Sequence, residues 1–362
     1  MIPITYSAFL NCTGYGQAAQ DYILALYNCG KYDIKIDSFG TYDSASCTKK
    51  RQDFLKSLQS KDKNNDSVQI YHCLPDLQKR KSKTAKTIGC VVYETFNPPK
   101  HWGQILSLND AVVVPSIFNL NIFKNMGIKS PIFYFPHCID YDLYKPDVES
   151  SEKYPGFSFL FFGSWKIRKG YSQLLEAWFN EFNSGDNVCL VIKTDKIGKA
   201  KKEVSLMKDK MGFKKKDIAP IFIEDKVLDE EKLPKFLKSF NCLISPTYGE
   251  GFYLPGLQCM RLGVPVIITN FSGCQDYANN QTATLLNPEG FVLHRSMDNY
   301  PQFANKKWAF ISVAEIRKQM RFAYENQDKI LEKTIYAIEE IGDKFSYEQC
   351  AKRFDKIIET VL

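Results

Sequence analysis

A glycine-rich loop between two apolar runs carries the residues best suited to chemistry. Residues 241–245 form a short apolar run that predicts a strand, and Glu250 follows it between Gly249 and Gly251. The helix expected next begins with unpaired N–H groups, which attract an anion or a hydroxyl-rich group, and the glycines let such a ligand approach the backbone. Glu250 would accept hydrogen bonds from it, and Gln258, about two turns along the helix, would face the same ligand. Residue types and spacing therefore predict a ligand-binding loop.

The same stretch resembles the nucleotide-sugar glycosyltransferases of glycosyltransferase family 4. Their E-x7-E signature places one glutamate on the hydroxyls of the donor sugar and a second on the ribose. Glu250 matches the first position, and Gln258 stands where the second glutamate is expected. A neutral amide at this position can still hydrogen-bond the ribose, but the stronger charge-assisted bond of a carboxylate is lost. A structural loop with a surface glutamate is the alternative. The resemblance also implies donor contacts at Gly251, Phe252, Tyr253 and Leu254.

A second loop carries three cations directly after the apolar run at residues 158–163. It is similar to the diphosphate-binding loop of the family, where cations neutralise the charge that grows on the leaving group. Lys169 matches the family's lysine. The family's arginine would fall at Ser164, so Arg168 or Lys166 would compensate. The alternative is an ordinary surface loop that carries cations.

Two further strand ends supply candidate donor contacts. Lys193 ends an apolar run in the second half of the chain. Near the N-terminus, Gly14, Tyr15 and Gly16 follow the strand predicted at residues 2–10 and lead into a helix. The third glycine of a dinucleotide fingerprint is missing, and a tight turn is the other interpretation. The resemblance implies that this turn faces the donor diphosphate and the acceptor.

Three residues are candidates for the acceptor side. His72 and Glu94 follow apolar runs, at the strand ends where open α/β sheets place their ligands. His137 lies in a segment that resembles the family's P-H-G-I-D motif, with Cys138 in place of the glycine. A core histidine and a surface carboxylate are the competing interpretations of His72 and Glu94.

Asp140 and Asp142 form a D-x-D pattern like the metal clamp of the other large glycosyltransferase fold. Because they directly follow the His137 segment, we interpret the similarity of these two aspartates to the metal clamp as a chance match. We therefore predict no metal, and no cofactor beyond a nucleotide sugar that serves as co-substrate.

Composition sets broad limits on the class of protein. A chain of 362 residues exceeds what one core usually supports, so two domains are expected. The net charge of +7 is compatible with an anionic donor, an anionic membrane or nucleic acid, and does not choose among them. The densest run of lysines, at residues 199–216, reads as a solvated surface.

The eleven cysteines include no C-x-x-C pair, and no apolar run of about 18 residues is present. With no signal peptide at the N-terminus, a reduced, cytoplasmic setting is expected, in which cysteines act as small buried apolar residues. Any contact with a membrane would be peripheral.

Strands and helices alternate along the chain, which predicts the α/β class with doubly wound parallel sheets. The resemblance implies the GT-B architecture, two Rossmann-like domains that face each other across a cleft. An acceptor-side domain at residues 1–146 would precede a donor-binding domain at 147–345, and a final helix at 346–362 would pack back on the first. The other helices expected in the second domain include residues 228–240, 308–326 and 328–341.

The resulting hypothesis is a retaining glycosyltransferase, with a hexose the expected sugar. It would move that sugar from a UDP- or GDP-sugar to a hydroxyl of a glycan or glycoconjugate. Three alternatives stay open: a pseudoenzyme that only binds a nucleotide sugar, a nucleotide-sugar epimerase, and a glycosyltransferase that acts on DNA bases. A reductase is the weakest interpretation, because the dinucleotide fingerprint is incomplete.

Overall fold

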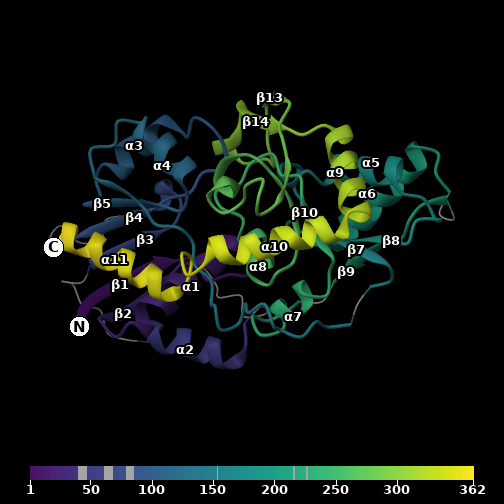
Figure 1. Ribbon diagram of the computed structural model, residues 1–362. Coiled ribbons are helices and arrows are strands. Elements are labelled where there is room, and N and C mark those ends of the chain that lie inside the picture. Colours follow the sequence, from purple (N-terminus) through teal and green to yellow (C-terminus); the bar gives the residue numbers. More distant parts are fainter. Residues whose placement is uncertain (40–46, 61–67, 79–84, 153, 215–216, 226) are drawn as a thin grey trace. The chain divides into compact units, whose positions relative to one another are not determined.

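The computed structural model describes residues 1–39, 47–60, 68–78, 85–152, 154–214, 217–225 and 227–362 (Figure 1). The chain divides into two compact units. The first comprises Met1–Leu143, Leu228–Glu231 and Gly342–Leu362, and the second comprises Tyr144–Val227 and Lys232–Ile341. The polar run at residues 61–66, which predicts an exposed loop, lies outside the described residues.

The first unit contains a parallel sheet with the strand order β2-β1-β3-β4-β5-β6. Its strands are β1 Ile2–Ala8, β2 Tyr32–Ser38, β3 Val68–His72, β4 Thr87–Cys90, β5 Ala111–Val114 and β6 Ile132–Tyr134. Its helices are α1 Gly14–Asn28, α2 Lys49–Gln59, α3 Lys100–Leu106, α4 Ile117–Lys124 and α11 Tyr347–Val361. Strand order reverses between β1 and β3, and ligands of open α/β sheets bind outside the carboxyl ends of strands at such a point.

The second unit contains another parallel sheet, with the order β12-β11-β10-β7-β8-β9. Its strands are β7 Phe157–Phe162, β8 Val188–Lys193, β9 Ile221–Glu224, β10 Cys242–Ser245, β11 Val266–Thr269 and β12 Thr284–Leu286. Its helices are α5 Tyr171–Glu181, α6 Ile197–Lys210, α7 Leu233–Leu237, α8 Leu254–Arg261, α9 Val313–Glu325 and α10 Gln327–Ile341. Here strand order reverses between β7 and β10, which is the second place where a ligand site is expected. No helix among the described residues is long and apolar enough to cross a bilayer.

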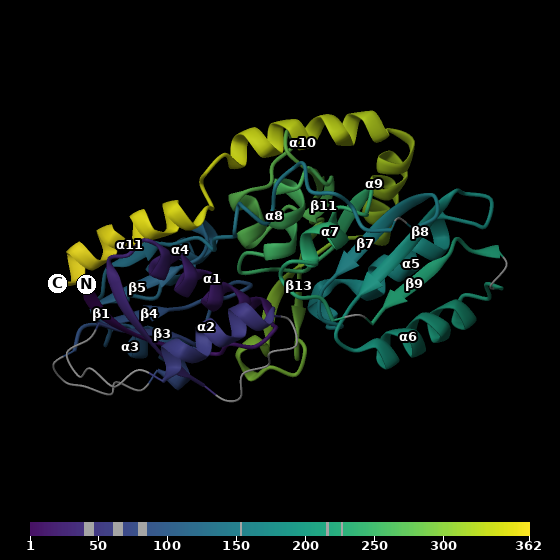
Figure 2. The ribbon, with the colours of Figure 1, turned by 90° about the horizontal axis from the view of Figure 1, so that it is seen from below.

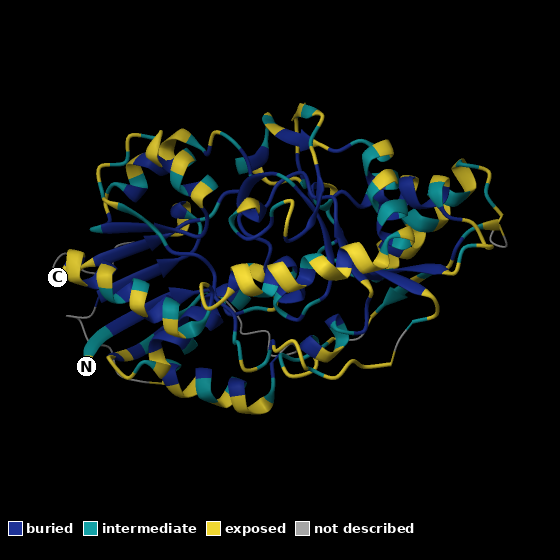
Figure 3. Cartoon of the chain, in the orientation of Figure 1, coloured by how far each residue is buried: buried dark blue, intermediate teal, exposed yellow. Residues whose placement is uncertain are grey.

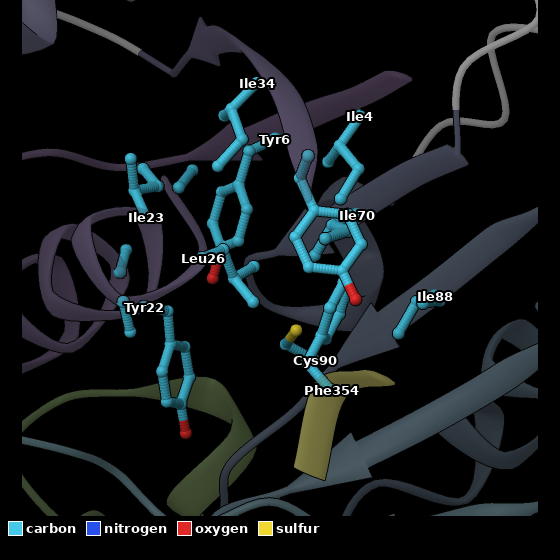
Figure 4. Close-up of a cluster of buried hydrophobic side chains, with 14 of the residues drawn as sticks. Ile4, Tyr6, Tyr22, Ile23, Leu26, Ile34, Ile70, Ile88, Cys90 and Phe354 are labelled. Atoms are coloured by element: carbon cyan, nitrogen blue, oxygen red, sulfur yellow. The ribbon is translucent and has the colours of Figure 1, made fainter. Parts of the chain in front are cut away.

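Apolar side chains cover both faces of the central strands, as a parallel sheet with helices on both sides requires. The strands are the most deeply buried parts of each unit (Figure 3). In the first unit, Ile4, Tyr6 and Ile70 from the strands pack with Ile23 of α1 and Phe354 of α11 (Figure 4). Both sheets therefore rest on fully buried cores that hold their strand ends in place.

The last helix belongs to the core of the first unit. Ser346 caps α11 by accepting a hydrogen bond from the Gln349 N–H. The Tyr347 hydroxyl donates to Asp21 Oδ1 at 2.7 Å, and the buried Arg51 guanidinium contacts the same oxygen at 2.9 Å. Burial raises the pKa of Asp21, and Arg51 opposes that rise. A buried ion pair thus joins α1, α2 and α11.

One predicted helix, at residues 308–326, is wrong at its start. Residues Lys306–Phe310 form β14, which pairs antiparallel with β13 Gly290–His294. Helix α9 begins only after Ser312, whose hydroxyl accepts from the Glu315 N–H. The S-x-x-E pattern that marks this start was present in the sequence.

A second predicted helix, at residues 228–240, is much shorter in the structure. Pro234 lies in the first turn of α7, where a proline fits without loss of a hydrogen bond. The acidic residues 229–231, inside the predicted range, lie before this helix. Glu230 instead accepts hydrogen bonds from the N–H and the hydroxyl of Thr48.

Replacing Arg51 with methionine should destabilise the chain by about 3–5 kcal/mol, because Asp21 would remain as a buried carboxylate without its cation. Urea unfolding measures this change. Replacing Asp21 with asparagine in the same protein should recover part of the loss. Lys49→Met removes the exposed pair of Lys49 with Asp53 and should change little. Equal effects of Arg51→Met and Lys49→Met would contradict the account.

Candidate functional site

The two loops singled out by the sequence lie next to each other in the second unit. Strands β7 and β10 are neighbours, with Phe159 opposite Cys242. The cationic loop leaves the carboxyl end of β7, and the glycine-rich loop leaves that of β10. Because strand order reverses between these strands, the sheet itself brings the loops together.

Backbone contacts fix one loop on the other. Gly170 has φ +73°, and a Cβ there would lie 1.9 Å from the carbonyl oxygen of Pro246, so no other residue fits. The Tyr248 N–H donates to the Arg168 carbonyl at 2.8 Å, and the hydroxyl oxygen of Thr247 lies 3.1 Å from the same carbonyl oxygen. The cations therefore have fixed positions relative to Glu250.

The carboxylate of Glu250 is the centre of this arrangement. Its Oε1 accepts from Lys169 Nζ at 2.6 Å and from the Thr247 hydroxyl at 3.0 Å. Its Oε2 accepts from Arg168 Nη1 at 2.9 Å. The residue is only 5% exposed, and its own N–H donates to the Ser272 hydroxyl. The three donors occupy three of the roughly four acceptor positions of a carboxylate, which leaves one on Oε2.

Opposing effects act on the proton affinity of Glu250. Burial favours the neutral carboxyl, but the charges of Arg168 and Lys169 and the hydrogen bonds they donate are stronger, and they lower the pKa to about 2. Glu250 is therefore an anion at every pH at which the chain would work. As a pure acceptor, it suits ligand hydroxyl groups.

Arg168 is buried rather than displayed on the loop. Its Nη1 donates to the Gly249 carbonyl at 2.7 Å as well as to Glu250, and Asp298 Oδ2 lies 3.9 Å from its Nε. Asp298 also accepts from the Arg168 N–H at 3.4 Å. Because acceptors surround the guanidinium of Arg168, its hydrogen bonds hold the Glu250 carboxylate in one orientation. This arrangement favours a role for Arg168 in positioning Glu250 over direct contact with a diphosphate.

Lys169 and the start of α8 form the side of the site with donor groups. The ammonium of Lys169 carries three N–H donors, of which Glu250 takes one, and it lies 5.0 Å from the centre of the Tyr253 ring. Tyr253 has φ +69°, and its hydroxyl donates to the Phe162 carbonyl at 2.8 Å. This left-handed backbone turns the chain into α8 directly beside β7. A Cβ on Gly273 would meet the Gly251 carbonyl at 2.0 Å.

The remaining donor candidates of the second unit lie around this centre. Phe252 and Leu254 are buried on either side of Tyr253, and Gln258 is buried on α8. Lys166 donates to the Tyr300 hydroxyl at 2.7 Å. Lys193 ends β8 beside Phe162, and burial lowers its pKa.

In the first unit, Gly14, Tyr15 and Gly16 lie at the carboxyl end of β1, at the start of α1. Thr13 caps α1 by accepting from the Gly16 N–H at 3.3 Å. A Cβ on Gly16 would lie 2.3 Å from the Asn11 carbonyl, so this glycine is required by the turn. The Tyr15 ring packs edge-on against His72 at 4.7 Å.

Two buried histidines face a small cavity at this end of the sheet. His72 ends β3, and its Nδ1 lies 2.9 Å from the Tyr6 hydroxyl. The Tyr22 hydroxyl donates its hydrogen to the Phe135 carbonyl. The hydroxyl oxygen of Tyr22 therefore accepts a hydrogen bond from His137 Nδ1, which carries the proton of the neutral ring. The acceptor nitrogen of His137 is then Nε2. Both histidines line a cavity of about 10 Å³, room for about one water molecule.

Glu94 lies four residues beyond the end of β4, so it is not at the strand end where the sequence predicted it. Burial raises the pKa of Tyr15, and the thiols of Cys73 and Cys90 and the charge of Glu94 add to that rise, so the Glu94 carboxylate lies near this phenol. Asp140 accepts a hydrogen bond from the Asp142 N–H at 2.8 Å, so the first carboxylate of the D-x-D pattern closes a local turn.

Three polar contacts of the site were missed from the sequence: Thr247 and Ser272, which bond Glu250, and Asp298, which pairs with Arg168. Thr247 is within the loop that was singled out, and a hydroxyl three residues before a carboxylate was a usable signal. Asp298 is 130 residues from Arg168 in the chain, and no local pattern connects them.

Comparison with known proteins identifies the class of the second unit. Residues 156–296 match the family described as Glycosyl transferases group 1, and this segment includes both loops and Glu250. This match confirms that the second unit resembles a glycosyltransferase domain, and it confirms the transferase class predicted from the sequence. The assignment to family 4 stays a prediction. No curated protein sequence matches the chain.

Solved structures share the fold over nearly the whole chain. HepE of Anabaena, in complex with UDP, is 11% identical, with 99% of this chain and 100% of HepE covered and a TM-score of 0.70. Sucrose-phosphate synthase of Thermosynechococcus elongatus is 12% identical, with coverage of 99% and 98% and a TM-score of 0.69. A glycosyltransferase of Rickettsia africae is 14% identical, with coverage of 99% and 98% and a TM-score of 0.68. The likeness concerns the fold, and it confirms the predicted GT-B architecture.

The two buried histidines should make stability depend on pH. Burial lowers the pKa of both His72 and His137 from 6.5 to about 3. Between these values the unfolded chain binds more protons than the folded chain, so stability falls as pH falls. The expected loss is about 2 kcal/mol per histidine between pH 7 and pH 5.

Urea unfolding at both pH values tests this, with His72→Gln/His137→Gln as the variant that should lose the extra pH dependence. His101→Gln is the control, because His101 is an exposed histidine beside Asp76. An unchanged pH dependence in the double variant would show that the two histidines are not held neutral.

Proposed function

We propose that the chain transfers a sugar from a nucleoside-diphosphate sugar to an acceptor hydroxyl of a glycan or glycoconjugate, with retention of anomeric configuration. The observation that carries the proposal is the buried anion of Glu250 beside the Lys169 ammonium, where strand order reverses, in the segment that matches the glycosyltransferase family. One group is an acceptor for hydroxyls and the other is a cation for phosphate.

The diphosphate would lie against Lys169 and the backbone N–H groups at the start of α8. Charge grows on the leaving phosphate as the glycosidic bond breaks, and a fixed cation in a partly buried site stabilises that charge. Lys166 and Lys193 would extend the positive charge around this position. Neutralisation by lysine and backbone dipoles is the basis on which we propose transfer without a metal ion.

The sugar would lie against Glu250. Its remaining acceptor position on Oε2 can take one sugar hydroxyl without displacing Arg168, Lys169 or Thr247. Gln258 on α8 would bind the ribose through its amide. We also propose Gly14, Tyr15 and Gly16 as donor contacts, as the resemblance implies.

In the transfer step, the bond between the anomeric carbon and the phosphate oxygen breaks, and its electron pair stays on the diphosphate. The acceptor oxygen bonds to the anomeric carbon on the same face. The acceptor proton passes to the departing phosphate oxygen. His72, Glu94 and His137 would orient the acceptor hydroxyl.

The HepE structures support a uridine donor among the candidates, because that protein was solved with UDP and with UDP-glucose. A GDP-sugar stays in the proposal, since no residue of this chain identifies the base. The proposed setting is cytoplasmic, and nine of the eleven free cysteines are buried, as expected for thiols that serve as apolar residues.

A thermal-shift panel of UDP, GDP, ADP, TDP and CMP with their sugar conjugates tests the proposal on wild type and on Glu250→Gln. A ligand at about 100 times its dissociation constant stabilises by about 2.7 kcal/mol. One nucleotide series should stabilise both proteins, and the extra stabilisation by its sugar should be lost in Glu250→Gln. Glu176→Gln, an exposed carboxylate of α5, should behave as wild type.

Each alternative class gives a different result. Stabilisation by a nucleotide sugar without turnover or hydrolysis would favour a binding protein. Release of a free epimerised sugar would identify an epimerase, and salt-sensitive binding to duplex DNA would favour a DNA-modifying transferase. If no nucleotide stabilises the protein, the proposal is wrong.

A further inference from the structure

The ribbon formed by β13 and β14 carries the densest group of exposed apolar side chains among the described residues. Five large apolar side chains between residues 291 and 310 are at least 36% exposed, and Leu293 reaches 62%. They are Phe291, Val292, Leu293, Tyr300 and Phe310. Side chains alternate between the two faces of a strand, so Phe291 and Leu293 share one face of the ribbon, with Lys307 opposite Leu293. Exposed apolar side chains on one face mark an interaction surface.

The same segment carries three cations. Arg295, Lys306 and Lys307 lie within the ribbon segment, which is defined as residues 289–310. The segment has two acidic residues, Glu289 and Asp298, and Asp298 forms the buried pair with Arg168. The surface of the segment is therefore apolar and basic, which suits a partner that is anionic outside and apolar beneath.

Helix α6 is a second positively charged segment of the same unit. Seven lysines lie between residues 196 and 214, against Glu203 and Asp209, so this stretch holds +5 of the net +7 of the chain. Leu206 is exposed among them. Figure 2 shows the ribbon segment and α6 reaching the lower edge of the second unit, with α10 along its upper edge. Residues 289–310 and 196–214, two separate segments that both reach this edge in Figure 2, are together called the basic-apolar face.

A second exposed apolar group, on α10, provides the contrast. Leu331, Ile335 and Tyr336 are exposed on that helix, but α10 carries four acidic residues against two lysines. An anionic partner would be repelled there. The two groups therefore differ in charge and in the direction they face, though both are apolar.

The ribbon segment is fixed to the loops of the candidate site. The Ala309 N–H donates to the Tyr248 carbonyl at 3.1 Å, and the His294 ring packs on Tyr248 at 5.7 Å. Asp298 pairs with Arg168. A partner bound to the segment would hold these loops close to its own surface.

We propose that the basic-apolar face binds the surface of an anionic phospholipid bilayer. Leu293 and Phe291 enter the boundary between headgroups and acyl chains, and the lysines of α6 lie over the anionic headgroups. A nucleic acid would pair with the cations but would leave the exposed aliphatic side chains in water. A bilayer accommodates both the cations and the aliphatic side chains, so we choose the bilayer as the partner. The inference stands on surface composition and does not depend on the proposed reaction.

Co-sedimentation with phosphatidylcholine vesicles, with and without phosphatidylglycerol, tests the proposal. Wild type should bind only the vesicles that contain phosphatidylglycerol, and added salt should weaken binding. Leu293→Glu and Lys201→Glu/Lys202→Glu should each reduce the partition coefficient by about tenfold or more. Ile335→Glu, the matched change on α10, should leave it unchanged, and thermal unfolding confirms that all variants fold.

Three results would overturn the proposal. Vesicle binding that is absent, or equal in all variants, excludes the face as a bilayer contact. Tighter binding to duplex DNA than to vesicles, unaffected by Leu293→Glu, assigns the cations to nucleic acid. A dimer in light scattering that Leu293→Glu dissociates, without vesicle binding, assigns the ribbon segment to a second copy of the chain.

Discussion

The buried carboxylate of Glu250, bound by Arg168 and Lys169, is the interaction on which the ligand loops of the second unit depend. Removing such charges from water costs several kcal/mol per ion, and apolar residues of similar volume often give equal or greater stability. Stability of the fold therefore does not explain why this cluster is present. The cluster is better understood as a pre-organised polar site, in which a fixed anion and a fixed cation await a ligand that carries hydroxyls and phosphates.

The fold supplies the rigidity that this cluster needs. Strand order brings the loops after β7 and β10 together, and the close approach of Gly170 to Pro246 leaves no freedom between them. Asp298 then adds a carboxylate from a distant segment, so that Arg168 is enclosed by acceptors. Glu250 consequently keeps one orientation without a bound ligand, and binding would not have to pay for ordering it.

The sequence predicted much of this, for identifiable physical reasons. Apolar runs that end in glycine or charged residues are strong signals, so the parallel sheets and both loops were found in the chain, and Glu250 and Lys169 do meet. The strand at Lys306–Phe310 was missed because its apolar residues also fit a helical spacing, although Ser312 and Glu315 marked the true start of α9. The buried position of Arg168 was not predicted, because one of the segments beside it, around Asp298, is distant in the chain.

The most direct test is the affinity of the nucleoside diphosphate selected by the panel for wild type and for Lys169→Met, measured by isothermal titration calorimetry. A charge-assisted hydrogen bond contributes about 1.5–3 kcal/mol, so the account predicts that the substitution weakens binding about tenfold or more. The corresponding nucleoside, which has no phosphate, should bind both proteins equally. Equal affinity of the two proteins for the diphosphate would contradict the assignment of Lys169, and with it the central role given to the Glu250 cluster.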